Sequence, residues 1–184
     1  MTKVQELRSG GVLLPVATVT VRIITIVLWV ALGVVLITIP AAIVLQGEIA
    51  KVLADGLTQD RAIGDPATLP WRIVAVLSGA AMLMALTIAF FTLLYRIAWS
   101  VQAGDPFIPE NAVRLRRMAW LFLATEAASV VLGITARALL PFADQGGGGI
   151  EISVTGLIAI LALFILARVF ELGTQMRAEI EGTV

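Results

Sequence analysis

The sequence predicts an all-α integral membrane protein: a bundle of four transmembrane helices with a short amphipathic outer helix after the first span. Two observations lead to this prediction. Of the 184 residues, 59% are hydrophobic and 14% are charged, and the mean hydropathy is +0.99. Soluble domains are usually about 45–50% apolar and about 25% charged. Four apolar runs are also long enough to cross about 30 Å of hydrocarbon, which takes about 20 helical residues.

The four apolar runs define the spans of a single membrane domain over residues 1–184. Because backbone polar groups in lipid must hydrogen-bond within their own segment, each run is expected to be a helix. The first run exceeds the roughly 7–15 apolar residues of a cleaved signal peptide, so it is expected to be retained. The spans cover about residues 23–45, 73–95, 118–140 and 150–170, followed by a cytoplasmic tail, 171–184.

The distribution of lysine and arginine predicts the orientation, since cytoplasmic loops are enriched in positive charge. With the amino terminus inside, four basic residues lie outside: Lys51, Arg61, Arg72 and Arg137. Nine lie on the cytoplasmic side: Lys3, Arg8, Arg22, Arg96, Arg114, Arg116, Arg117, Arg168 and Arg177. We therefore expect a multi-pass protein with both termini in the cytoplasm.

Two outer connections differ in character. The first begins "EIAKVLADGL", where Ile49, Val52, Leu53 and Leu57 recur at helical spacing. This pattern is typical of a short amphipathic helix that lies on the membrane or over the bundle. The second contains "DQGGGG", residues 144–149, which indicates a flexible tether.

The cytoplasmic loop "GDPFIPENAVRLRRMAW", residues 104–120, follows the second span. Gly104 is suited to end a helix, and Pro109 to the first turn of the next one. Arg114, Arg116 and Arg117 are expected at the level of the lipid phosphates, where they anchor the third span. The start of a helix and the positive charge typical of a cytoplasmic loop thus account for most of this segment.

A protein-binding surface is the alternative explanation, because apolar residues of the loop are exposed in a polar turn. The tail adds an amphipathic strip at helical spacing, which lies on the membrane or binds a partner helix. Its acidic residues weaken attraction to anionic lipid and favour a protein partner. The candidate partner-binding residues are Phe107, Ile108, Arg114, Arg116, Arg117, Leu172, Met176 and Ile180.

The segments "GDPFIPENAVRLRRMAW" and "LARVFELGTQMRAEIEGTV" resemble the bacterial membrane family catalogued as domain of unknown function 2975. Members carry a similar loop after the second span and a similar tail, whereas Glu171 and Leu172 depart from the arginine and glutamate that are frequent there. The resemblance implies a four-span protein of the bacterial inner membrane, often encoded near a small helix-turn-helix regulator of the Xre type. It implies no established activity.

Glu126 lies within the third predicted span, where an ionised side chain costs several kcal/mol. We expect it to pair with Arg168, with Arg22 as the next candidate, because these residues share a similar depth. The alternatives are that the arginines extend to the interface, or that Glu126 senses a proton or a ligand.

Composition also excludes several functions. The chain has no cysteine and no histidine, which removes thiolate nucleophiles, the usual neutral-pH base and standard zinc sites. We expect no catalytic residues, no cofactor, no metal and no enzyme activity. The zero net charge argues against direct binding of nucleic acid.

Two functions fit these features. The first is a regulatory or sensing membrane protein that engages a cytoplasmic partner, such as an Xre-type regulator. The alternative is a small transporter or channel subunit that uses Glu126, assembled as a homo-oligomer because four spans enclose little space.

Overall fold

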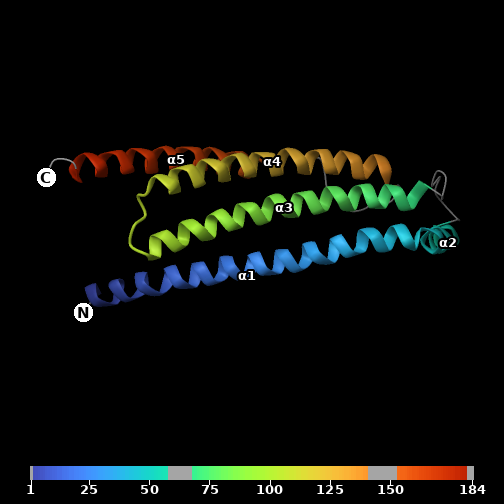
Figure 1. The fold of residues 1–184 in the computed structure, drawn as a ribbon, viewed down its shortest axis with the longest axis horizontal. Coiled ribbons are helices and arrows are strands. Elements are labelled where there is room, and N and C mark those ends of the chain that lie inside the picture. The colour runs from blue at the N-terminus through green and yellow to red at the C-terminus, as the bar shows by residue number, and fades with distance from the viewer. Residues whose placement is uncertain (1, 58–67, 141–152, 182–184) are drawn as a thin grey trace. The chain divides into compact units, whose positions relative to one another are not determined.

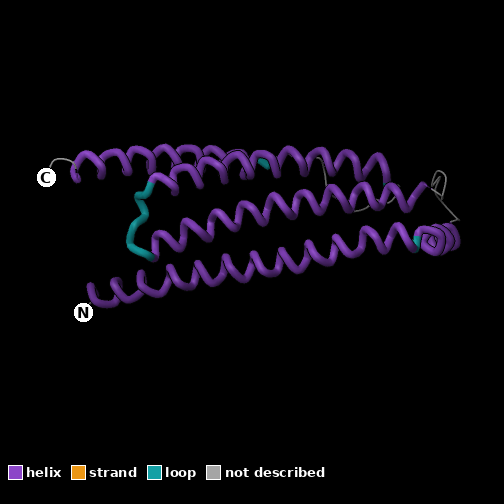
Figure 2. The backbone as a smooth tube through the Cα atoms, in the orientation of Figure 1, coloured by secondary structure: helices purple, strands orange, loops and turns teal. Residues whose placement is uncertain are grey.

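A computed structural model describes residues 2–57, 68–140 and 153–181, and this part of the chain folds into five α-helices (Figure 1). Neither a strand nor a β-bridge occurs within those ranges (Figure 2). The helices are α1 (Thr2–Val44), α2 (Gln46–Leu57), α3 (Leu69–Gln102), α4 (Pro109–Leu139) and α5 (Val154–Glu181). The predicted all-α class is therefore confirmed for the described residues.

Four of these helices are long and apolar enough to cross a membrane: α1 from Pro15 onward, α3, α4, and α5 as far as Glu179. Only 6–17% of the residues in their most apolar windows are buried within the chain. Their remaining surface is largely hydrophobic and matches lipid better than water. Four helices of this kind indicate a multi-pass membrane protein. Their assembly as a bundle and the outer position of α2 stay predictions.

Each long helix extends beyond its predicted span at one end or both. The first begins at Thr2 rather than at residue 23, and α4 begins at Pro109 rather than at residue 118. The fourth predicted span starts at residue 150, outside the described residues, and its helix continues to Glu181. Hydropathy marks only the segment suited to lipid, whereas arginine, glutamine and glutamate have high helix propensity, so the helices continue past the apolar segments.

Hydroxyl groups in the apolar helices are satisfied by the helix that carries them. Thr25 and Thr38 each donate to a carbonyl four residues earlier, at 2.8 Å, and Thr92 does so at 2.7 Å. Such bonds remove the cost of placing a hydroxyl in hydrocarbon. These polar residues therefore do not conflict with a lipid environment.

The chain divides into two compact units, and α1, α3 and α4 contribute to both. Unit 1 consists of Met1–Trp29, Leu86–Ala124 and Val154–Val184. Its core is formed by residues of α3, α4 and α5: Ile97, Leu115, Met118 and Ala167, with Phe90, Leu93, Leu94, Val101, Leu163 and Phe170 around them. In unit 1, Gln102 Nε2 also donates to Thr18 Oγ1 at 2.5 Å, which ties α3 to α1.

Unit 2 consists of Val30–Ala85 and Thr125–Ser153. A glycine permits the close approach of α3 and α4 in this unit. A Cβ added at Gly79 would lie 2.6 Å from Leu132 Cδ1, closer than van der Waals contact allows. The absence of a side chain at Gly79 thus makes room for Leu132.

Candidate functional site

The end of α3 is closed by a glycine in the left-handed conformation. Gly104 has a φ of 88°, and its N–H donates to the carbonyl of Val101 at 3.1 Å. The next N–H, from Asp105, donates to the carbonyl of Ser100 at 3.2 Å. These two bonds form a Schellman motif. The predicted helix end at Gly104 and the predicted helix start at Pro109 are both confirmed.

Asn111 joins α3, the loop 103–108 and α4, and it is fully buried. Its Nδ2 donates to Ser100 Oγ at 2.6 Å and to the Pro106 carbonyl at 2.9 Å. Its Oδ1 accepts from Arg114 Nη1 at 2.8 Å. A buried amide with all these partners fixes the loop relative to both helices.

Phe107 lies against α5 although 42% of it is exposed. Its ring centroid is 5.3 Å from that of Phe170, and a Cβ added at Gly173 would lie 2.8 Å from its Cδ1. Gly173 therefore provides the space into which the ring fits. Ile108 is half-buried and lines a pocket with Trp99. A role of Phe107 in binding a partner stays a prediction, since part of its ring already contacts this chain.

Ion pairs hold the C-terminal part of α5 to the loop and to α4. Glu171 Oε2 is 2.9 Å from Arg168 Nη1 and 3.3 Å from Arg116 Nη2. Asp105 pairs with Arg177. All of these side chains are about one-third exposed or more, so solvent screens the pairs and each one contributes little to stability.

The opposite side of α5 presents an exposed apolar strip. Val169, Leu172 and Met176, three and four residues apart, are 51%, 43% and 59% exposed. Ile180 lies in the same helix, but its side chain is outside the described part of the structure. The strip predicted from the sequence is therefore helical, and its described side chains are uncovered by the chain.

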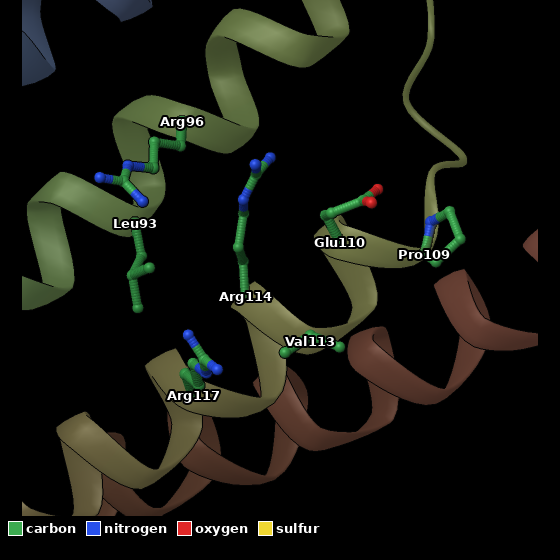
Figure 3. A pocket seen from close by; sticks show the side chains of 7 residues that line it. All are labelled: Leu93, Arg96, Pro109, Glu110, Val113, Arg114 and Arg117. Atoms are coloured by element: carbon green, nitrogen blue, oxygen red, sulfur yellow. The ribbon is translucent and has the colours of Figure 1, made fainter.

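Three arginines surround a pocket of about 350 Å³ between α3 and α4 in unit 1 (Figure 3). Arg96 comes from α3, while Arg114 and Arg117 come from α4, and Glu110 is the one carboxylate among the described residues of the lining. An adjoining pocket of about 330 Å³ shares Arg96 and Arg114 and adds Trp99 and Tyr95. The arrangement provides an excess of positive charge beside aromatic side chains.

The predicted intramembrane pair involves residues of both units. Glu126 is half-buried on α4 and belongs to unit 2, whereas Arg168 and Arg22 belong to unit 1 and are exposed. Within unit 1, Arg168 donates to Glu171. The pairing of Glu126 with Arg168 or Arg22 stays a prediction.

Two residues that organise this site, Asn111 and Gly173, are not among the sequence-predicted candidates. Asn111 shares a helix face with Leu115 and Met118, four and seven residues later, and that spacing was the available signal. Across residues 2–57, 68–140 and 153–181, no group of three or more acidic side chains is placed to hold a metal ion.

No family model, no curated protein and no solved structure matches this chain. The class of this protein therefore rests on its structure: it is an all-helical chain whose four long apolar helices suit a multi-pass membrane protein. The resemblance to the family of unknown function 2975 stays a prediction.

Proposed function

We propose that this chain is a regulatory or sensing protein of the bacterial inner membrane that holds a cytoplasmic partner on the exposed strip of α5. Arginine and lysine are more frequent in the loop 103–108, the termini and the adjoining span ends together than on the other side of the predicted spans. This excess supports a cytoplasmic position for both termini. The observation that carries the proposal is the two-sided character of α5 after residue 170, where the span predicted from the sequence ends. One side is attached to the loop and to α4, and the other leaves Leu172 and Met176 exposed.

An exposed apolar strip on a helix fits the groove of a partner protein. The attachment of the other side through Glu171, Arg177 and Phe107 presents the strip in one orientation, which lowers the ordering cost of binding. A small helix-turn-helix regulator is the partner that the sequence resemblance implies. Because this chain has no DNA-reading motif of its own, control would operate by holding the regulator at the membrane.

The test is co-purification of the full chain from native membranes in mild detergent, with mass spectrometry of the bound proteins. We expect Leu172→Gln and Met176→Gln to reduce retention of a cytoplasmic partner by about tenfold each, since each removes an apolar side chain that the bound partner would bury. Val52→Gln is the matched control, because Val52 is 69% exposed on α2 and lies far from the strip in sequence. The proposal would be contradicted if the Leu172 and Met176 variants retained as much partner as the unsubstituted protein, or if Val52→Gln lost as much partner as they do.

The alternative is an oligomeric transporter or channel subunit that uses Glu126. The observation in its favour is that the half-buried Glu126 carboxylate makes no ion pair with a described residue of its own unit, unit 2. Reconstituted vesicles test this alternative: it requires a solute or ion flux that Glu126→Gln abolishes and Glu110→Gln preserves.

A further inference from the structure

We propose that the pocket between α3 and α4 binds the phosphate headgroup of an anionic phospholipid through Arg96, Arg114 and Arg117. The inference requires the chain to span a membrane, but it does not depend on a cytoplasmic partner. Its first support is position. Arg96 directly follows the second predicted span and Arg117 directly precedes the third, so both side chains fall at the edge of the hydrocarbon.

The second support is that three arginines from two helices line the same pocket. Arg96 on α3 and Arg117 on α4 are far apart in sequence, yet they line one pocket of about 350 Å³ (Figure 3). This volume lies within the range of roughly 300–1,000 Å³ that is typical of ligand sites. Basic pockets between transmembrane helices are a known means of binding anionic headgroups.

The third support is that the arginines retain donors for a ligand. The guanidinium groups of Arg96 and Arg117 make no hydrogen bond or ion pair with a described residue of unit 1. Arg114 uses one nitrogen, Nη1, for the neutral amide of Asn111. That bond orients its guanidinium without neutralising it, so Arg114 is pre-organised for an anion. By contrast, Arg116 is paired with Glu171 and lines a separate pocket.

The neighbouring aromatic residues fit the same level of a bilayer. Trp99 is 61% exposed and lines the adjoining pocket with Tyr95, Arg96 and Arg114. Tryptophan and tyrosine are enriched where headgroups meet acyl chains. Leu93, which lies within the predicted span and also lines the arginine pocket, would contact the acyl chain while the phosphate stays at the arginines.

The experiment is native mass spectrometry of the full chain in detergent, titrated separately with phosphatidylglycerol and phosphatidylcholine. We expect tighter binding of phosphatidylglycerol by the unsubstituted protein. Arg96→Gln and Arg117→Gln should each weaken it by about tenfold, since each removes charge-assisted hydrogen bonds to phosphate. Glu110→Gln should tighten it several-fold, because it removes a carboxylate that lines the pocket and repels the phosphate.

Arg22→Gln is the matched control. Arg22 also flanks a predicted span, is exposed and does not line the pocket, so its loss should change the affinity by about twofold or less. Equal binding of the two lipids, or equal loss in the Arg22 and Arg117 variants, would overturn the proposal. Displacement of phosphatidylglycerol by matched concentrations of inorganic phosphate would assign the site to a soluble anion and also overturn it. Should an arginine variant fail to fold, the lipid comparison and Glu110→Gln still decide the question.

Discussion

Replacing Asn111 with alanine removes the side chain that joins the end of α3, the loop 103–108 and the start of α4. The change eliminates three hydrogen bonds, to Ser100, Pro106 and Arg114. Each contributes about 1 kcal/mol net. Ser100 Oγ keeps its bond to the Ile97 carbonyl, and Pro106 is only half-buried, so water can reach the exposed carbonyl. We therefore expect Asn111→Ala to lower the free energy of unfolding by about 3 kcal/mol.

The assay is titration of the purified protein from mixed micelles with sodium dodecyl sulfate, followed by far-ultraviolet circular dichroism. Gln102→Ala is the control, because it removes a single hydrogen bond, to Thr18, and should lower the free energy of unfolding by about 1 kcal/mol. A loss for Asn111→Ala no larger than that of the control would refute the reasoning that this amide fixes the loop.

Three further perturbations probe other parts of the structure. Gly173→Ala should cost about 1 kcal/mol of unfolding free energy by forcing the Phe107 ring away, and in a Phe107→Ala background it should instead stabilise the protein through helix propensity; the same sign in both backgrounds would contradict the contact. If Glu126 pairs with Arg168, the losses of unfolding free energy from Glu126→Gln and Arg168→Gln should couple by more than about 0.5 kcal/mol. Additive losses for these two changes, together with coupling between Arg168→Gln and Glu171→Gln, would show that Arg168 pairs within α5 and contradict the pairing with Glu126. For topology, Val52→Cys should react with an impermeant maleimide in intact cells, and Ala103→Cys only after permeabilisation; the chain has no native cysteine to interfere, and the reverse pattern would invert the orientation.

The long helices could be predicted from the sequence because their signal is local. A run of about 20 apolar residues determines both the solvent and the backbone conformation, since lipid offers no partner for a free N–H. The helix end at Gly104 and the helix start at Pro109 could also be predicted from the sequence. A helix end with positive φ favours glycine, and a first turn that needs no N–H donor favours proline.

The contacts that build the site could not be predicted in this way. Asn111 meets Ser100 and Pro106 only because the loop reverses the chain, and no spacing in the sequence encodes that amide's partners. Arg168 shows the same limit. Its depth in the predicted span favours Glu126, and that pairing stays a prediction, whereas its ion pair with Glu171, one helical turn later, was not among the predictions made from the sequence. Charge pairing depends on which faces meet, and hydropathy does not report helix rotation.

The connection between α3 and α4 leaves no spare chain length. Gly104 and Asp105 bond back to α3, Pro106 accepts from Asn111, and Phe107 seats on α5 before Pro109 begins the next helix. Even one inserted residue would shift every later partner out of register with the earlier ones. A fluorescent tag or protease site inserted into this connection would therefore disrupt folding. Here the number of residues is as constrained as their identity.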